Sequence, residues 1–243
     1  LPSLQSATNG IGRGNFMVII ARPETGKTAF WVSLVASVGG FAWQQKKVSI
    51  FANEEPAIRT QMRLLNACTG LQRGSILNGS RDLTKKVWGE INPYIENFDC
   101  VGKTMDDLNE YCTNNEVDIL IIDQLDKINV TGKFNATHEK LREVYTQARE
   151  LAKRHNILVI GMSQASAEAQ GRSRVTFSAM ENSKTGKAAE ADIILGLGKE
   201  DEQENFMDDC IRFVTLSKNK LTGDHKEFEV ILRPTISRFA ERN

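Results

Sequence analysis

The sequence has no excess of either charge, and this limits what it can attract over long range. Lysine plus arginine and aspartate plus glutamate each number 31 in 243 residues, so the formal net charge is zero. A basic field over the whole surface, which would favour nucleic acid as a partner, is therefore excluded. Binding of nucleic acid stays open only through local loops.

Long hydrophobic runs are also lacking. No apolar stretch approaches the roughly 20 residues that cross a bilayer. The opening segment, LPSLQSATNG, has neither the basic start nor the apolar stretch of a secretory signal. We expect a soluble protein of the cytoplasm with no membrane partner. Because the chain begins with Leu1 instead of methionine, we also expect that an N-terminal domain of the full protein is absent.

Cysteine and histidine are few and scattered, which disfavours a zinc site or a disulfide framework. The cysteines form no C-x-x-C pair, and the histidines are isolated from one another. Widely spaced cysteines in a cytoplasmic protein are typically reduced thiols. The residues concerned are Cys68, Cys100, Cys112, Cys210, His138, His155 and His225.

The composition that is present, 40% hydrophobic and 26% charged, suits one globular domain, which we expect to span residues 1–243. Short apolar runs alternate with longer amphipathic segments, and this pattern predicts strands alternating with helices. The expected strands are 16–21, 47–53, 117–123, 157–164, 191–197, 210–218 and 227–232. The expected helices are 27–38, 56–69, 104–115 and 136–154, the last capped by Thr137.

The near-continuous apolar character of these strands is typical of a sheet covered on both faces. Repeated strand-helix-strand units predict an α/β fold with a mostly parallel, doubly wound sheet and its ligand at the carboxyl ends of the strands. The segments 211–218 and 226–231 follow each other across a short polar turn. We expect them to form an antiparallel hairpin at the edge of the sheet.

The segment ARPETGKTAF, residues 21–30, joins a predicted strand to a predicted helix. It matches the phosphate-binding pattern of Gly, four residues, then Gly-Lys-Ser/Thr, except that Ala21 holds the first glycine position. Alanine fits there if the turn does not need a positive φ. The alternative is an ordinary strand-to-helix connection.

In a phosphate loop, the backbone amides of residues 24–28 surround the phosphates at the positive end of the helix. Lys27 then reaches the β/γ-phosphate oxygens and Thr28 coordinates Mg²⁺. We therefore expect ATP, or another nucleoside triphosphate, with Mg²⁺ as cofactors. The expected binding residues are Arg22, Pro23, Glu24, Thr25, Gly26, Lys27, Thr28 and Ala29.

Acidic residues end two other predicted strands. Asp123 ends VDILIID, the arrangement of a Walker B strand, and would hold the metal that Thr28 touches. Glu54 and Glu55 follow the second strand, and one of them should face the γ-phosphate as the base for the attacking water. The alternative for Glu55 is the start of a helix, where acidic residues are favoured before Pro56.

Three more polar residues sit near strand ends. Gln164 ends ILVIGMSQ and is placed to bond the γ-phosphate or the water that attacks it. Lys218 and Lys220, in SKNKLTG, lie two residues apart on one expected face. Lysines on an edge strand commonly discourage aggregation. The functional alternative is a pair of cations that reach the γ-phosphate bound by a neighbouring subunit.

Together these segments resemble the DnaB-type replicative helicases, which have a RecA-like ATPase core. GRGNFMVIIARPETGKTAF looks like the start of that core, FANEEPAIRTQMRLL its segment with the catalytic glutamate, ILIIDQLDKI its Walker B strand and IGMSQAS its sensor glutamine. MENSKTGKAAEADIILGLGKED is similar to the stretch after the second DNA-binding loop. The likeness covers nearly the whole chain.

By position, the resemblance implies that Glu54 is the catalytic base, Arg63 supports it, Asp123 carries the metal and Gln164 is the sensor. The chain departs from the family at Ala21 and in Lys218-Asn219-Lys220, where the family often has Lys-x-Arg. Residues 70–100 also match poorly. Divergence of this kind suits a bacteriophage helicase, which would act in the cytoplasm of its host.

The resemblance further implies a motor that assembles as a homo-oligomeric ring, expected to be a hexamer, with ATP between neighbours and single-stranded DNA in the central channel. A primase or a helicase loader is an expected partner. ATP hydrolysis would move the loops 129–137 and 166–186 along the strand. The expected DNA contacts are Lys133, Arg172, Arg174 and Lys184, cations that follow phosphates without reading sequence.

Two other functions stay open on the sequence alone. The spacing Lys218-x-Lys220 favours a RecA or RadA-type recombinase, which forms filaments and exchanges strands. The zero net charge favours a RecA-fold ATPase that regulates through protein partners and not through DNA.

Overall fold

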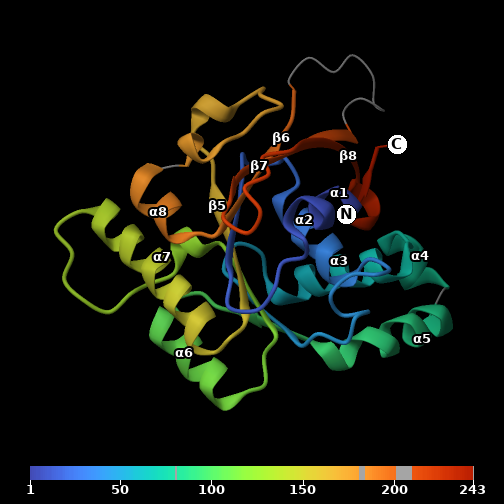
Figure 1. Cartoon of the computed structure of the whole chain (residues 1–243). Coiled ribbons are helices and arrows are strands. Elements are labelled where there is room, and N and C mark those ends of the chain that lie inside the picture. The colour runs from blue at the N-terminus through green and yellow to red at the C-terminus, as the bar shows by residue number, and fades with distance from the viewer. Residues whose placement is uncertain (80, 181–183, 201–209, 243) are drawn as a thin grey trace.

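A nine-stranded sheet runs through the centre of the molecule (Figure 1). The computed structural model describes residues 1–79, 81–180, 184–200 and 210–242, with the backbone alone at 184 and 185. The strands in this part of the chain are β1 (Phe16–Ala21), β2 (Val48–Ala52), β3 (Ile95–Asp99), β4 (Ile119–Asp123), β5 (Leu158–Gln164), β6 (Ile193–Gly198), β7 (Ile211–Asn219), β8 (Glu227–Arg233) and β9 (Arg238–Glu241).

The strand order across the sheet is β3-β2-β4-β5-β1-β6-β7-β8-β9. Strands from β3 to β6 pair in parallel, whereas β7, β8 and β9 pair antiparallel. The prediction of a mostly parallel sheet with antiparallel strands at one side is confirmed. The predicted hairpin exists as β7 and β8, but β9 lies outside it, so neither β7, which carries Lys218, nor β8 is an edge strand.

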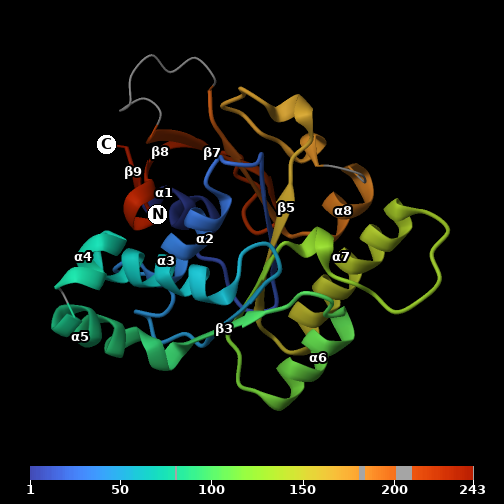
Figure 2. The same cartoon turned by 180° about the vertical axis from the view of Figure 1, so that it is seen from behind.

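Helices cover both faces of the sheet, as Figures 1 and 2 show from opposite sides. On one face lie α1 (Pro2–Thr8), α2 (Lys27–Ala36), α3 (Ala57–Thr69), α4 (Arg73–Asn78) and α5 (Arg81–Ile91). On the other lie α6 (Met105–Asn114), α7 (Thr137–Arg154) and α8 (Lys184–Glu190). The short 3-10 turns include η2 (Leu125–Lys127), η3 (Ala167–Ala169), η4 (Phe177–Ala179) and η6 (Pro234–Ile236).

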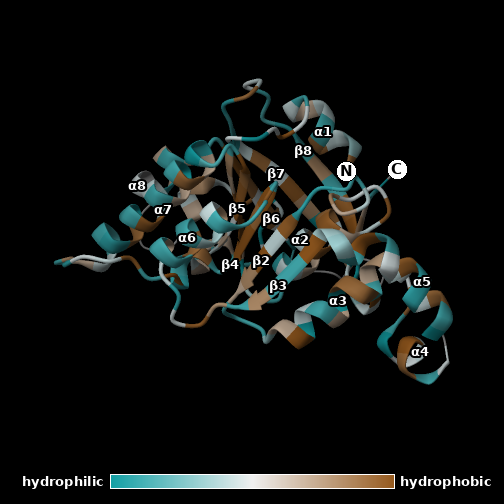
Figure 3. Ribbon diagram, turned by 90° about the horizontal axis from the view of Figure 1, so that it is seen from below, coloured by the Kyte–Doolittle hydropathy of each residue, from teal (hydrophilic) through white to brown (hydrophobic). Residues whose placement is uncertain are grey.

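Strand β1 shows how the sequence produces this layering. All of its residues are buried, and successive side chains point to opposite faces. Met17 and Ile19 join the core under α2, while Phe16, Val18 and Ile20 join the core under α7. The hydropathy colouring of Figure 3 shows the same division, with brown strands between helices whose outer faces are teal.

The predicted helices and strands exist with small shifts at their ends. The first predicted helix ends at Ala36, two residues early, and Thr137 is the first residue of α7 and not its cap. The cap position belongs to Ala136, which makes no side-chain capping bond. By contrast α6 begins with a full capping box between Thr104 and Asp107.

The elements that were not predicted are α1, α4, α5, α8, β3 and β9. Strand β3 reads IENFD, without the apolar run of the other parallel strands, because it is an edge strand with half-exposed side chains. Helices α4 and α5 lie in the segment 70–100, which matches the family pattern poorly, and they expose apolar residues, including Leu77 and Leu83.

The two ends of the described chain lie side by side (Figure 1). The backbone amide of Ser3, in α1, donates to a carboxylate oxygen of Glu241 in β9 over 2.6 Å. No helix in the described part of the chain is long and apolar enough to cross a membrane.

Candidate nucleotide-binding site

The loop between β1 and α2 has the backbone that the phosphate-loop pattern predicts. Ala21 is still in the extended strand, so the first glycine position does not need a positive φ. Glu24 and Gly26 do have positive φ, of 63° and 105°. A Cβ on Gly26 would lie 2.9 Å from the Cδ2 of Leu232 and 3.3 Å from the Cζ of Phe239. Glycine is thus required at residue 26 and dispensable at 21.

The first residues of α2 line the pocket. As at every helix start, their backbone amides have no partner within the helix and carry the positive end of its dipole. The Thr25 amide, one of those expected to surround the phosphates, instead donates to the carbonyl of Arg22 over 3.4 Å. This bond closes the loop on itself. Thr25 is also held from outside. The Nε of Arg212, a buried residue of β7, donates to the Thr25 carbonyl over 2.8 Å. No sequence pattern indicates this support, since Arg212 lies 187 residues away.

Thr28 and Asp123 lie together, as a shared metal would require. The Thr28 hydroxyl donates to Oδ2 of Asp123 over 3.1 Å, and the indole of Trp31 donates to the same oxygen over 2.8 Å. The other oxygen, Oδ1, is buried without a hydrogen-bond partner among the described residues. Burial raises the pKa of Asp123, and the ammonium of Lys27 opposes that rise. A hydroxyl beside an unsatisfied carboxylate oxygen is a donor set that fits Mg²⁺.

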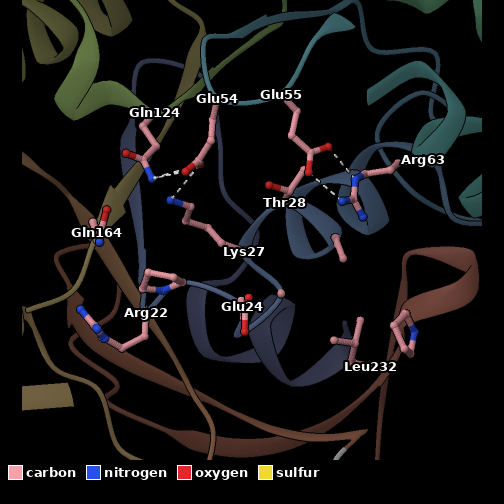
Figure 4. Close-up of a pocket in the computed structure, with 14 residues that line it drawn as sticks. Arg22, Glu24, Lys27, Thr28, Glu54, Glu55, Arg63, Gln124, Gln164 and Leu232 are labelled. Carbon is pink, nitrogen blue, oxygen red and sulfur yellow. Dashed lines mark hydrogen bonds and ion pairs between the residues drawn. The ribbon is translucent and has the colours of Figure 1, made fainter. Parts of the chain in front are cut away.

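Glu54 faces the phosphate-loop lysine. Its carboxylate lies 3.7 Å from Nζ of Lys27 and 3.6 Å from Nζ of Lys127. The side-chain amide of Gln124 donates to both of its oxygens, over 3.2 and 3.1 Å (Figure 4). Gln124 was missed by sequence reasoning, although it directly follows Asp123. These contacts point the Glu54 carboxylate into the pocket beside Lys27.

Glu55 points away from Glu54 toward Arg63. Two hydrogen bonds, of 2.9 and 2.7 Å, join the guanidinium to both oxygens of Glu55, and the carboxylate raises the pKa of Arg63 (Figure 4). Arg63, expected as a supporting residue near Glu54, lines the same cavity as Glu54, and its direct partner is Glu55. The start of α3 is satisfied elsewhere, by Asp99, which accepts from the Ala57 amide over 2.7 Å.

A cavity of about 440 Å³ joins these groups. Its lining includes most of the predicted cofactor residues, whereas Thr25 and Asp123 are buried behind it. Gln164, from the end of β5, lines it on the side of Gln124. Leu232 and Pro234, from β8 and η6, form an apolar side of the cavity, and no sequence pattern predicted that they would lie there. The predicted residues at the cavity are Arg22, Pro23, Glu24, Gly26, Lys27, Thr28, Ala29, Glu54, Glu55, Arg63 and Gln164.

The segment after β5 contacts the phosphate loop directly. Arg22 donates to the carbonyl of Ala165 over 3.1 Å and to the side chain of Gln170 over 3.4 Å. A bridge between Ala165 and Met180 closes the segment into a loop, drawn in gold in Figure 1. The loop rests on β6, where a Cβ on Gly196 would lie 1.8 Å from the Val175 carbonyl oxygen.

The predicted DNA contacts lie on two separate loops. Arg172 and Arg174 are exposed on the loop closed at Ala165. Lys133 is exposed on the loop before α7, which projects from the body of the molecule (Figure 1). Lys184 begins α8, but its side chain lies outside the described residues.

Lys218 and Lys220 lie far from their own chain's phosphate loop. Lys218 pairs with Ile194 near the start of β6, at the amino ends of the parallel strands, whereas the phosphate loop follows their carboxyl ends. Both ammonium groups donate to carbonyls at the end of α8, Lys218 to Ala188 and Ala189, and Lys220 to Ala189 over 3.3 Å. The ladder between β7 and β8 ends at Thr215, so Lys218 lies on a stretch of β7 that pairs with β6 alone, and protection of an unpaired strand end remains the alternative for these lysines.

A parallel sheet that brings a glycine-lysine-threonine loop and a strand-end glutamate to one cavity, with a strand-end aspartate bonded to the threonine behind it, defines a P-loop nucleoside triphosphatase. The chain belongs, more narrowly, to the family described as the DnaB-like helicase C terminal domain, whose model matches residues 1–241.

Among curated relatives, a "probable plasmid replicative DNA helicase" of Chlamydia psittaci is 29% identical over 227 residues, which cover 86% of this chain and 48% of that protein. The replicative DNA helicase DnaB of Geobacillus stearothermophilus is 25% identical, over 70% of this chain and 39% of its own length. The chain therefore spans about half the length, or less, of these relatives.

Solved structures agree on the fold. The ATPase domain of G40P superposes with a TM-score of 0.86 at 22% identity, covering 100% of this chain and 89% of that one. A DnaB-like replicative helicase studied for its interactions with primase gives a TM-score of 0.83 at 22% identity, over 100% and 61%. The RadB recombinase matches less well, with a TM-score of 0.62 at 12% identity over 99% and 97%. The RecA-like fold expected from sequence is confirmed.

Proposed function

We propose that this chain is the ATP-hydrolysing motor domain of a replicative DNA helicase, which moves along single-stranded DNA and unwinds duplex. The observation that carries the proposal is that Lys27 and Glu54 line one cavity, from two different strand ends, while Asp123, from a third, accepts from Thr28 at the wall of that cavity. Membership of the DnaB-like helicase family supports coupling of this hydrolysis to movement on DNA. We place the motor as a single domain over residues 1–243, in the cytoplasm that holds the DNA it acts on.

Different residues at the cavity bind the phosphates, hold the metal and activate the attacking water. Lys27 and the first amides of α2 bind the phosphates, and Thr28 with Asp123 holds Mg²⁺. Bound there, Mg²⁺ neutralises charge on the β- and γ-phosphates. Glu54 accepts the proton of the attacking water, because it is the carboxylate that lies beside Lys27. Gln124 fixes the orientation of Glu54, and Gln164 contacts the γ-phosphate from the end of β5.

The positions of Lys218 and Lys220 favour action on a neighbouring subunit. They sit at the opposite end of the sheet from their own phosphate loop, so a site that uses them needs a second copy of the chain. We propose a homo-oligomeric ring, hexameric by the family resemblance, with a primase or loader as a partner of the whole protein. Single-stranded DNA would lie against Lys133, Arg172, Arg174 and Lys184.

A recombinase is the second candidate, favoured by the spacing Lys218-x-Lys220 and by the shared fold with RadB. Negative-stain images of the protein with ATP and single-stranded DNA separate the two. Closed rings are expected for the helicase. Open filaments along the DNA would favour the recombinase, and no response to DNA would favour a regulator that binds protein.

Glu54→Gln tests the assignment of the base. Nucleotide binding should persist, because Lys27, Thr28 and Asp123 are unchanged, while ATP hydrolysis should fall by about two to four orders of magnitude, the scale of losing a general base. The measurement is steady-state ATPase activity together with the Kd of a fluorescent ATP analogue. Lys27→Ala is the contrasting variant, in which binding itself should be lost.

Glu55→Gln is the matched control, since it removes the neighbouring carboxylate and frees Arg63 without touching Lys27. If Glu55→Gln traps ATP and Glu54→Gln does not, the assignment of the base is wrong.

A further inference from the structure

A carboxylate that the proposed chemistry does not use, and that is only 14% exposed, lies one turn beyond the metal-binding strand. Asp126, in η2, accepts four hydrogen bonds. Its Oδ2 accepts from the Ser163 hydroxyl over 2.7 Å and from the Gln164 amide over 3.1 Å. Its Oδ1 accepts from the Tyr145 hydroxyl over 2.9 Å and from Nζ of Lys187 over 2.7 Å. The carboxylate therefore joins β5, α7 and α8 at one point.

Lys187 is buried to an extent that is rare for a lysine. Its side chain is 1% exposed, and its ammonium also lies 5.3 Å from the centre of the Tyr145 ring. Lysine is almost never fully buried unless it is paired. Burying such a pair contributes little net stability, because desolvation offsets the attraction and an apolar pair of the same volume is often as stable. Stability alone therefore does not account for the pair, and a role in position does.

The two partners lead in opposite directions. On the side of Asp126, the bonds from Ser163 and Gln164 fix the end of β5, which lines the nucleotide cavity. On the side of Lys187, the next two residues of α8 are Ala188 and Ala189, whose carbonyls accept from Lys218 and Lys220.

Helix α8 thus links the two ends of the sheet. A helix of 7 residues is about 10 Å long at 1.5 Å per residue. Lys187 reaches from it to the carboxyl end of β5, while the residues after the helix enter the start of β6, where the Asp192 carbonyl accepts from the Lys220 amide over 2.9 Å. The ion pair connects the β5 end to α8 across a closely packed interior, which is the kind of environment that transmits strain.

We propose that Asp126 and Lys187 are a positioning pair that couples Gln164, at the cavity of one subunit, to Lys218 and Lys220, which act on the cavity of the next. This rests on the proposed function, since it needs those lysines to act in trans. Through the pair, the presence of a γ-phosphate at Gln164 sets the place of α8 and hence of the cations offered to the neighbour. Hydrolysis in one subunit is thereby linked to hydrolysis in the adjacent one.

Lys187→Met tests the pair, because methionine keeps much of the buried volume and removes the charge. Asp126 keeps its bonds from Ser163, Gln164 and Tyr145, so the variant's own cavity keeps its geometry. We expect kcat for ATP to fall about tenfold to a hundredfold, the scale of a catalytic group displaced by about 1 Å. The KM for ATP and the Kd for nucleotide should hardly change. Unchanged kcat would overturn the proposal.

The double variant Asp126→Asn/Lys187→Met guards against a folding defect, because it leaves no unpaired charge from this pair in the interior. It should fold as the wild type does and show the same loss of kcat. Ile91→Ala is the stability control. It lowers stability at the end of α5, in the core on the other face of the sheet, and leaves the Asp126–Lys187 pair intact. If that variant, with a comparable fall in Tm, loses kcat equally, the effect of Lys187→Met is structural and the proposal fails.

Mixing experiments locate the defect. Lys187→Met protomers have an intact phosphate loop, and Lys27→Ala protomers have an intact Asp126–Lys187 pair, so their mixture should regain ATPase activity. Lys220→Ala mixed with Lys27→Ala is the reference for action in trans. Recovery in the reference but not with Lys187→Met overturns the positioning pair and leaves the proposed function standing. No recovery in the reference overturns the trans action of the lysines, and the pair with it.

Discussion

Gly26 is the residue at which sequence pattern and structure agree most closely. Its φ of 105° is one that side chains rarely adopt, and the space for a Cβ is already taken by Leu232. The two constraints come from different parts of the chain, one from the turn itself and one from β8. A substitution here therefore strains the loop that holds the phosphates and shifts the apolar side of the cavity as well.

Gly26→Ala should weaken nucleotide binding far more than it lowers stability. The cost of a residue in an unfavoured backbone region is about 1–3 kcal/mol, and a loop that relaxes to avoid it no longer aligns the amides of α2. We expect a large rise in the Kd for ATP, measured by fluorescence titration, with a modest fall in Tm. Gly223→Ala is the control, since that glycine has φ of 77° but nothing within 4 Å of its Cβ position. Equal nucleotide affinity in the two variants would contradict this account.

Lys218 is a second residue whose environment has a measurable consequence. Burial, and next the ammonium of Lys220, lower its pKa from 10.5 to about 8. Because the folded pKa lies below the unfolded one, the cost of burying the charged amine is present in full below pH 8. That cost disappears as the pH rises from about 8 to 10.5.

We expect Lys218 to react with amine-directed acylating reagents at pH 8 faster than it does in Lys220→Ala. Removing the neighbouring ammonium raises the pKa of Lys218 and so lowers the fraction of neutral amine. Mass spectrometry of the labelled protein gives the rate at this residue. Equal rates in the wild type and in Lys220→Ala would show that Lys220 does not perturb Lys218.

At the scale of elements, the sequence predicted those strands and loops whose defining residues follow one another in the chain. Strand β1 and the loop after it could be identified because apolar run, glycine and lysine follow one another in the chain. Strand β4 and Asp123 could be identified for the same reason. Strand β3 could not, because its polar side chains are explained only by its place at the edge of the sheet.

The site shows the same limit. Glu54 and Gln164 follow apolar strands and were found, but their arrangement depends on contacts that no spacing encodes. Arg63 lies 8 residues from Glu55 and pairs with it because α3 turns the guanidinium back toward the strand end. Leu232 reaches the cavity only because the antiparallel strands return β8 to the end of the sheet where β1 stops.

The loop closed by Ala165 and Met180 is the element to test for DNA binding. Replacing Arg172 and Arg174 by alanine should weaken binding of single-stranded DNA equally for different sequences. The slope of log K against log salt should fall by roughly 0.7 for each phosphate that the variant no longer neutralises. The measurement is fluorescence anisotropy of labelled oligonucleotides over a range of salt concentrations.

The control removes two charges from another element. Lys85→Ala/Lys86→Ala changes two lysines of α5, on the opposite side of the sheet, and should leave the salt slope as it is. If the two double variants behave alike, DNA does not bind at the loop after β5.

At the scale of the whole molecule, the order of the sheet separates two halves of one proposed site. The parallel strands carry the phosphate loop, Asp123 and Glu54 at their carboxyl ends. The antiparallel β7 returns through the sheet and delivers Lys218 to the amino ends, where it pairs with the start of β6. The Asp192 carbonyl accepts from the Lys220 amide, and Asp192 lies level with Phe16, so the five residue steps from Phe16 to Ala21 separate Lys220 from the phosphate loop. That is about 16 Å at 3.3 Å per residue, which a lysine side chain cannot bridge. The fold therefore supplies both halves of the site, but in one copy it cannot bring them together.

ATPase activity should in consequence depend on protein concentration. When protomers are dilute, each cavity lacks the cations of a neighbour, so the specific activity should be low; it should rise and level off as protomers associate. Lys220→Ala should show the same association in sedimentation or light scattering, with a low plateau of activity, because it removes the cation and leaves the subunit interface in place. The experiment measures specific activity and assembly state over the same dilution series, with saturating ATP and Mg²⁺. A specific activity that stays constant while the protein dissociates would mean that one copy holds a complete site, and it would remove the structural reason for requiring an oligomer.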